Sequence, residues 1–121
     1  MKRSTILEDV PIAFIGAGAM GEAMIGGLLA HRLVTPEAIT ASDLDGSRLR
    51  AIEDLFHVHT TSNNRRAVRK ARLVVLAVKP QGLSSVFAEL KGAIEPSTLV
   101  VSILAGVRIA SIAEGLEHDA I

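Results

Sequence analysis

The sequence predicts a doubly wound α/β fold, a single domain in which helices cover both faces of one parallel sheet. Short apolar segments alternate with segments of helical spacing along the chain, and this alternation is typical of a parallel sheet. Hydrophobic residues make up 49% of the sequence but aromatic residues only 2%. The core is therefore expected to consist of Val, Ile, Leu and Ala, as in sheets that are buried on both faces. The length of 121 residues fits one domain.

The first strand and the first helix are expected on either side of a glycine-rich segment. Val10 to Ile15 is a short apolar run that predicts a strand, and Met20 to His31 shows helical spacing. Val34 to Glu37 breaks this helix and begins a connector, because Pro36 stands where a first helical turn begins.

Two weaker units are expected in the middle of the chain. Ile39 to Ser42 predicts a second strand, and Asp45 is a suitable N-cap for a helix that reaches about Phe56. Val58 to Thr60 predicts a weak third strand. A basic helix that ends near Lys70 follows, and one of three neighbouring polar residues is expected to cap it: Ser62, Asn63 or Asn64.

The clearest buried strand runs from Leu73 to Val78 and is stopped by Pro80. A helix is expected over Leu83 to Leu90, a further buried strand over Leu99 to Ile103, and a last helix over Arg108 to Glu114.

The last residues, Ala120 and Ile121, have the character of another strand that is just beginning. This pattern favours a fragment of a longer protein, although a short natural tail would look the same. Residues 1–9 are expected to form a flexible segment, and residues 10–121 the folded domain.

The composition narrows the classes of function. Thirteen basic and thirteen acidic residues cancel, so the overall charge does not point to nucleic acid or to an anionic membrane. The absence of cysteine excludes disulfides, thiolate catalysis and zinc–thiolate sites. No segment approaches the ~20 apolar residues of a membrane span, and no long apolar run precedes Pro11. A soluble, cytoplasmic protein is expected.

Gly16, Gly18 and Gly21 form a Gly-x-Gly-x-x-Gly motif between the first predicted strand and the first predicted helix. In this motif the glycines allow a tight turn, the approach of a pyrophosphate to the backbone, and close packing of helix on strand. The pyrophosphate faces the free N–H groups of the helix that starts near Ala19. The loop, which also contains Ala17 and Met20, therefore predicts a Rossmann-like fold that binds NAD(H) or NADP(H). A glycine-rich turn that serves packing alone is the alternative.

Asp43 follows the second predicted strand, where an acid can bind the hydroxyls of the adenosine ribose. A carboxylate at this position favours NAD, because it repels a 2′-phosphate. Ser42, Ser47 and Arg48 lie close enough in the sequence to bind such a phosphate, and Asp43 or Asp45 could simply cap the next helix. The choice between NAD and NADP stays open.

Ala77 to Gln81 ends the fourth predicted strand. The carboxyl ends of strands in an open α/β sheet face the ligand crevice. Pro80 stops the strand and leaves carbonyl groups and the Lys79 ammonium near the expected cofactor. Taken alone, this segment would be interpreted as a turn between a strand and a helix.

Four segments together resemble pyrroline-5-carboxylate reductases. The longest is Ile12 to Leu29, and the others are Ile39 to Asp43, Leu76 to Gln81 and Ser102 to Val107. The resemblance extends from about Ile12 to the C-terminus. Many dehydrogenases share the glycine loop, whereas the last two segments at their spacing are more specific.

The resemblance implies a role for each matching residue. The glycine-loop residues, with Ser42 and Asp43, would hold the adenosine and phosphate half of the cofactor, and Asn64 would lie by the adenine ribose. The nicotinamide half would be bordered by Ala77, Val78, Lys79, Pro80, Ala105 and Gly106. Enzymes of this family reduce 1-pyrroline-5-carboxylate to L-proline by hydride transfer from NAD(P)H, with the protein orienting the cofactor.

The sequence departs from the family pattern in two ways. Family members continue with an Arg-x-Met-Pro-Asn-x-Pro segment and a long helical domain that forms the dimer and most of the substrate pocket, and this sequence has neither. Arg72 also stands where an acid is common, at a position expected to be exposed. We therefore expect cofactor binding without appreciable turnover, an imine substrate only in a longer enzyme, and an open possibility of a homodimer.

Two alternatives to this function remain. The nucleotide domain could belong to an F420-dependent NADP reductase or a β-hydroxyacid dehydrogenase, or the chain could be a stand-alone, non-catalytic dinucleotide-binding module.

Other polar residues have simpler interpretations. A basic cluster is expected to be a solvated helix face, because no aromatic residues accompany it; it consists of Arg65, Arg66, Arg69, Lys70 and Arg72. His57 and His59 are expected on one face of a strand, exposed and without a third metal ligand. Ser102 has no His/Asp arrangement that would make it a nucleophile, so a backbone role is expected.

Overall fold

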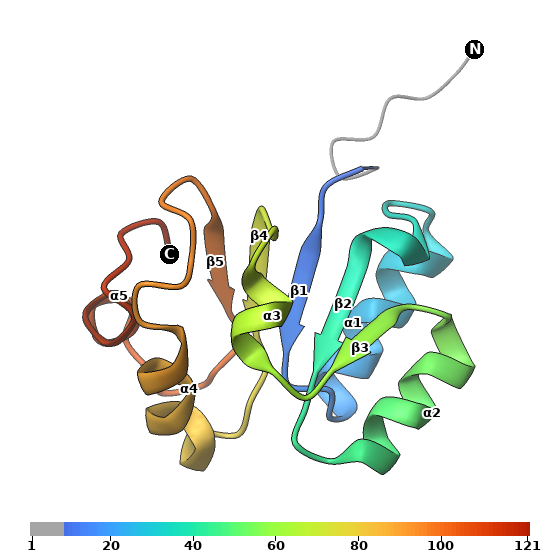
Figure 1. Cartoon of the computed structure of the whole chain (residues 1–121), viewed down its shortest axis with the longest axis horizontal. Helices are drawn as coiled ribbons and strands as arrows, with labels where there is room; N and C mark the ends of the chain where they lie inside the picture. The colour runs from blue at the N-terminus through green and yellow to red at the C-terminus, as the bar shows by residue number, and fades with distance from the viewer. Residues whose placement is uncertain (1–8) are drawn as a thin grey trace.

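Five parallel strands form one sheet in the computed structural model, which describes residues 9–121 (Figure 1). Their order across the sheet is β3-β2-β1-β4-β5. The strands are β1 (Ile12–Ile15), β2 (Ile39–Ser42), β3 (His59–Thr61), β4 (Leu73–Leu76) and β5 (Leu99–Ser102). All neighbouring pairs are parallel, so the predicted α/β fold is confirmed.

Helices cover both faces of this sheet (Figure 1). They are α1 (Ala19–Ala30), α2 (Gly46–Phe56), α3 (Asn64–Val68), α4 (Leu83–Leu90) and α5 (Ile109–Leu116), with short 3₁₀ turns η1 (Pro36–Ala38) and η2 (Pro80–Gly82). α1 and α2 pack on one face, and α3, α4 and α5 pack on the other.

The central strand β1 is buried on both sides, and its successive side chains point alternately into two separate cores. Ile12 and Phe14 pack with residues of α1 and α2, such as Ile25 and Ile52. The intervening residues of β1, Ala13 and Ile15, pack with residues of α3, α4 and α5. The low aromatic content is consistent with this arrangement, because aliphatic residues make up most of both cores.

The order of strands reverses at β1, and this reversal positions the site. α1 connects β1 to β2 on one side, whereas α3 leads the chain from β3 back across the sheet to β4 on the other. Ile15 is therefore in register with Ser42 of β2 and with Leu76 of β4. In folds of this kind, ligands bind beyond the carboxyl ends of the strands at such a reversal.

Some predicted boundaries of the strands were wrong by one or two residues. β1 begins at Ile12 and not at Val10, because Pro11 has no N–H group and contributes only its carbonyl, which accepts from Arg72 and Leu73 at 2.9 and 3.3 Å. β4 ends at Leu76 and β5 at Ser102, earlier than expected, as the chain turns towards the next helix. β3 starts after Val58, because His57 adopts a left-handed conformation (φ 59°) that ends α2.

Most helices also begin or end within two residues of their predicted bounds, and one strand and one helix have the predicted bounds at both ends. These are β2 and α4. Asp45 caps α2, which ends at Phe56 as predicted. α3 is shorter than predicted and ends at Val68; its cap is Asn63, whose side chain accepts from the Arg66 N–H at 3.0 Å. α1 starts one residue before Met20, and α5 runs to Leu116, past the predicted end at Glu114.

The last residues form no strand, but they lie beside one. The Val100 N–H of β5 donates to the Ala120 carbonyl at 2.8 Å. The interpretation of Ala120 and Ile121 as strand-like therefore has a structural counterpart in one main-chain contact with the edge of the sheet.

The remaining expectations concern the chain as a whole. The predicted flexible segment, residues 1–9, lies outside the described residues except for Asp9. Within residues 9–121, no helix has both the length and the apolar character needed to cross a membrane.

Candidate functional site

A cleft of about 1020 Å³ opens beyond the carboxyl ends of β1, β2 and β4. The glycine loop after β1 forms one part of its wall, the residues after β2 a second, and the turn after β4 with one face of α4 a third. Its position is the strand-order reversal, where the fold predicts a ligand site.

Gly16 lies so close to the end of β4 that no side chain fits. A Cβ on Gly16 would stand 2.7 Å from both the carbonyl carbon and the oxygen of Ala77, and the φ of Gly16 is +103°. Its N–H donates to the Ser42 carbonyl at 2.9 Å, so the loop is joined to β2 as well. Gly16 is therefore a requirement of the fold itself.

Gly18 and Gly21 have different roles. A Cβ on Gly21 would stand 2.7 Å from the Gly16 carbonyl oxygen, so Gly21 lets α1 pack against the loop. Gly18 has an ordinary φ of −76°, and apart from its two neighbours in the chain no heavy atom of the described residues lies within 4 Å of the place where its Cβ would be. Since Gly18 lines the cleft at the N-cap of α1, its missing side chain leaves room for a ligand.

A side chain that directly follows β2 and one from α2 hold the second residue of the loop. The Ala17 N–H donates to Asp43 Oδ2 at 2.8 Å, and the Ala17 carbonyl accepts from Arg48 Nε at 2.7 Å. Arg48 Nη2 also forms an ion pair at 2.6 Å with Glu22 in the first turn of α1. The glycine loop is thus tied to two elements that are distant in the sequence.

Asp45, and not Asp43, caps α2. One Asp45 carboxylate oxygen accepts from the N–H groups of Ser47 and Arg48 at 3.0 and 3.3 Å and from the Ser47 hydroxyl at 2.7 Å. These bonds, with that from the Ser47 hydroxyl contributing most, hold the pKa of Asp45 below its ordinary value. Asp43 accepts the Asp45 N–H at 2.9 Å through Oδ1, so both of its oxygens bind backbone.

A polar chain crosses the floor of the cleft from β2 to α4. The Ser42 hydroxyl donates to Asn64 Oδ1 at 2.5 Å, and Asn64 Nδ2 donates to Glu89 Oε1 at 3.2 Å. Ser42 and Asn64 are buried. Their polar atoms therefore have partners within the protein, although both residues line the cleft.

The structure brings most of the predicted cofactor residues to this cleft. Those that line it are Gly16, Gly18, Ala19, Ser42, Asp43, Arg48, Asn64, Ala77, Val78 and Lys79. Ala17 is buried and contributes through its backbone to the loop, and Gly21 is buried behind it. The others do not line it: Met20, Pro80, Ala105 and Gly106, all of which are exposed.

Sequence reasoning missed one wall of the cleft. Gly82, Ser85, Val86 and Glu89 line it from α4 and the turn before it. They stand at positions i, i+3, i+4 and i+7, which places them on one face of a helix. This spacing, directly after a strand that ends at the crevice, was a signal that could have found them. Leu44, Asp45 and Gln81 complete the additional lining residues.

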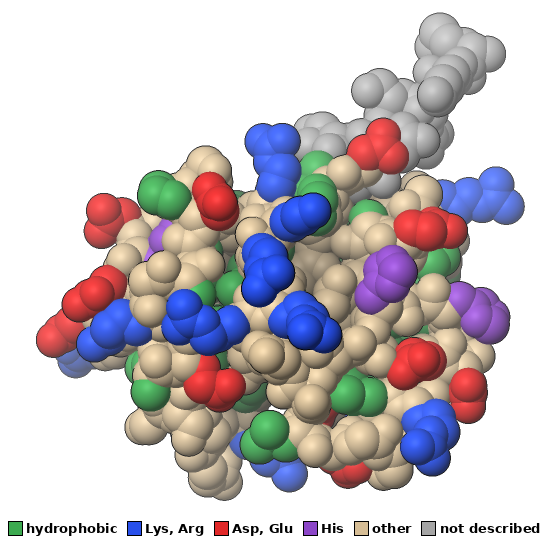
Figure 2. All heavy atoms as spheres, viewed as in Figure 1, with side chains coloured by type: hydrophobic (Ala, Val, Ile, Leu, Met, Phe, Trp, Pro, Cys, Tyr) green, Lys and Arg blue, Asp and Glu red, His purple; other side chains and the backbone are tan. Residues whose placement is uncertain are grey.

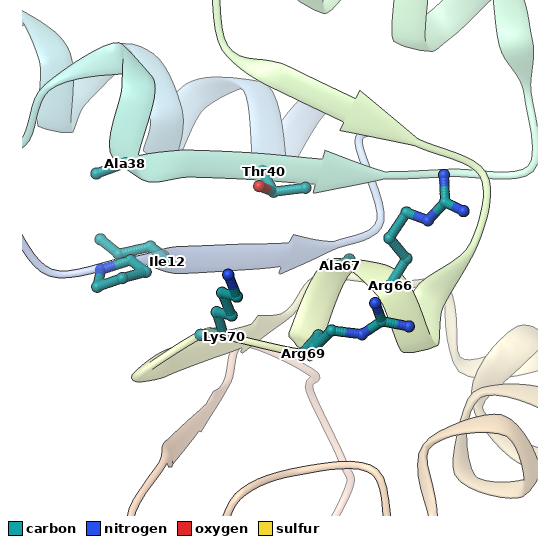
Figure 3. A pocket seen from close by; sticks show the side chains of 9 residues that line it. Ile12, Ala38, Thr40, Arg66, Ala67, Arg69 and Lys70 are labelled. Carbon is teal, nitrogen blue, oxygen red and sulfur yellow. The ribbon is translucent and has the colours of Figure 1, made fainter.

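The basic cluster lies elsewhere. Basic side chains gather over α3 (Figure 2), and Arg66, Arg69 and Lys70 line a separate hollow of about 210 Å³ beside Ile12 and Thr40 (Figure 3). This hollow shares no lining residue with the larger cleft. The neighbouring Arg65 guanidinium donates to the Glu89 carbonyl at 3.1 Å, and Arg72 is exposed, as expected.

The other polar residues do not form a second site. His57 ends α2 and is not part of β3, so the prediction that it shares a strand face with His59 was wrong. Among residues 9–121, no group of three or more His, Cys, Asp or Glu side chains is placed to hold a metal ion. The Ser102 hydroxyl accepts the Leu104 N–H at 3.1 Å, which is a backbone role.

The sequence of this chain is similar to those of known proteins. Residues 11–106 match a family model described as NADP oxidoreductase, coenzyme F420-dependent. Pyrroline-5-carboxylate reductases from Methanosarcina acetivorans and Pseudomonas aeruginosa are 40% and 42% identical over 110 and 101 residues, which are 91% and 84% of this chain but 41% and 37% of those proteins. The chain thus spans about two fifths of the length of these curated relatives.

Solved structures of proteins with similar names also resemble this chain. A pyrroline-5-carboxylate reductase from Coxiella burnetii matches with a TM-score of 0.85 and 34% identity, over 90% of this chain and 40% of the other. The Plasmodium falciparum pyrroline carboxylate reductase, solved with NADP bound, has a TM-score of 0.75 at 24% identity over 91% of this chain and 39% of the other, a likeness of fold.

Proposed function

The chain belongs to the family of coenzyme F420-dependent NADP oxidoreductases, and we propose that its cleft binds NAD(H) or NADP(H) as the dinucleotide-binding part of a pyrroline-5-carboxylate reductase. Three relatives that carry that name are 34–42% identical to this chain over aligned segments that cover 84–91% of it.

The observation that carries the cofactor proposal is the open face of Gly18. Gly16 and Gly21 are required by contacts within the protein, whereas space above Gly18 is clear and lies in the cleft at the start of α1. The first N–H groups of a helix lack partners in the helix and attract an anion. A pyrophosphate fits this cradle, because it needs both the close approach and the donors.

The remaining residues of the cleft suit the two ends of a dinucleotide. Asp43, Arg48 and Asn64 line the side next to β2, which we assign to the adenosine half. Ala77, Val78 and Lys79 line the side after β4, which we assign to the nicotinamide half. When bound, the reduced nicotinamide supplies the hydride, and the protein orients it and excludes water.

In the whole enzyme the acceptor would be the imine carbon of 1-pyrroline-5-carboxylate, with L-proline as the product. The described residues supply the cofactor cleft and no assigned imine-binding group. We therefore propose that these 121 residues bind the cofactor without appreciable imine reduction.

An enzyme that itself uses coenzyme F420 as the partner of NADP is the second candidate, because the family to which the chain belongs carries that description. The two differ in the partner of the nicotinamide, which is a small imine in one and a deazaflavin in the other. A hydride-transfer assay with each acceptor, on a protein that includes any further domain, separates them.

Titration calorimetry of NADH and NADPH into the chain tests the cofactor proposal. We expect binding of at least one cofactor by the unmodified chain and none by Gly18→Val, since the valine would occupy the place of the pyrophosphate. Gly27→Val is the matched control. A Cβ on Gly27 would also meet no other part of the fold within 4 Å, but Gly27 is exposed on α1 and does not line the cleft. Thermal melting checks that both variants fold. Absence of binding at millimolar cofactor, or equal binding by Gly18→Val, would overturn the proposal.

A further inference from the structure

We propose that the cleft prefers NAD(H) to NADP(H), an inference that rests on the proposed cofactor function. The observations that carry it are the charges at the end of β2 and the bonds that already engage the one arginine there. The family description names NADP, so the preference would separate this chain from the description of its family.

Carboxylates are held in place where the adenosine ribose would lie. Asp43 and Asp45 both line the cleft after β2. The two oxygens of Asp43 accept backbone N–H groups from Ala17 and Asp45, so this carboxylate cannot turn away from the cleft without breaking the bond that holds the glycine loop. A 2′-phosphate brings about two further negative charges to the same place, and like charges at close range repel.

Arg48 is the cation that could compensate for these charges, and it is already engaged. Among the described residues that line the cleft, the cations are Arg48 and Lys79, and Lys79 stands on the other side, after β4. The Arg48 guanidinium donates to the Ala17 carbonyl and pairs with Glu22. Its charge is therefore balanced by Glu22, and a bidentate contact to a phosphate would compete with the bonds that hold the loop.

The free 2′-hydroxyl of NAD meets no such conflict. A carboxylate has about four lone-pair sites, and Asp43 uses two of them for backbone donors. The remaining sites can accept a ribose hydroxyl without any rearrangement of the loop. The same carboxylate thus positions the glycine loop and discriminates between the cofactors.

Separate titrations of NADH and NADPH into the 121-residue chain, in low salt, test this inference. We expect NADH to bind at least about tenfold more tightly, which corresponds to about 1.4 kcal/mol. The ratio of the two dissociation constants is expected to fall by several-fold in Asp43→Asn, which removes the repelling charge, and in Glu22→Gln, which releases Arg48. Glu37→Gln, the same change on an exposed residue outside the cleft, is expected to leave the ratio unchanged. High salt should narrow the ratio, because it screens the repulsion.

A general weakening of the loop in these variants raises both dissociation constants alike, so it does not change their ratio. Thermal melting checks that the variants fold. Binding of NADPH as tight as that of NADH, or a ratio that neither Asp43→Asn nor Glu22→Gln lowers, would overturn the preference while leaving the cofactor function intact. Absence of binding by both cofactors would instead overturn the proposed function, and the preference with it.

Discussion

Asp43 and Arg48 hold the two ends of a single residue, Ala17. The carboxylate accepts the Ala17 N–H at 2.8 Å, and the guanidinium donates to the Ala17 carbonyl at 2.7 Å. The side chain of Ala17 is buried beneath the loop. Because the N–H, the carbonyl and the side chain of Ala17 are all held in place, the glycine loop has its conformation before any ligand binds. A ligand therefore need not supply the free energy to order the loop.

Removal of the arginine should therefore weaken cofactor binding without unfolding the chain. In Arg48→Met the Ala17 carbonyl and Glu22 lose their partner, and we expect the dissociation constant for NADH to rise about tenfold. Arg50→Met is the matched control, since Arg50 is an exposed residue of the same helix. Calorimetry gives the constants. Equal affinities in the two variants would show that the loop does not depend on Arg48.

A methyl group at Gly16 should destabilise the fold, in contrast to a change at Gly18. In Gly16→Ala the Cβ would lie 2.7 Å from the Ala77 carbonyl group at a positive φ, and both effects are costly. We expect the free energy of unfolding, measured by urea denaturation, to fall by about 3 kcal/mol. Gly18→Ala should change it by less than about 0.5 kcal/mol, the usual range at unconstrained positions. Similar values for the two variants would contradict the different roles assigned to these glycines.

The buried Ser42–Asn64 bond should contribute to stability. Ser42→Ala removes the hydroxyl that donates to Asn64 Oδ1 and leaves that oxygen without its donor. We expect the free energy of unfolding to fall by about 1–2 kcal/mol, because a buried polar atom without a partner is costly. Ser47→Ala provides a comparison on an exposed serine and should cost less. Urea denaturation measures both, and no loss in Ser42→Ala would show that water replaces the hydroxyl.

The cap of α2 should make stability depend on pH in the acidic range. The pKa of Asp45 is lowered in the folded chain from its ordinary value of 3.8, mainly by the bond from the Ser47 hydroxyl. A lowered folded pKa means that the stabilisation is complete well above pH 3.8 and is lost as the pH falls through the folded pKa. Asp45→Asn keeps a capping oxygen but has no charge.

We therefore expect the melting temperature of the unmodified chain to exceed that of Asp45→Asn at pH 7. The difference should shrink as the pH falls below the ordinary value of 3.8 and should be lost once the pH is below the lowered pKa of the folded chain. Melting curves across this range measure it. A difference that stays constant with pH would mean that the cap acts without its charge.

Local patterns were enough to predict the fold and the loop. The alternation of apolar and helical segments predicted the parallel sheet, and β2 and α4 have the predicted bounds. Asp45 was recognisable as a cap from its position before α2. These signals are local, because hydrophobic periodicity and helix capping depend on neighbours within a few residues.

The sequence by itself therefore determined the class of fold, the dinucleotide motif and the resemblance to a reductase. Only the tertiary structure decided what the charged residues around the motif do. Ala17 lies 26 residues from Asp43 and 31 from Arg48, and the missed wall of the cleft belongs to α4. A parallel sheet brings the carboxyl ends of distant strands to one edge, and the contacts made there depend on packing and not on spacing along the chain.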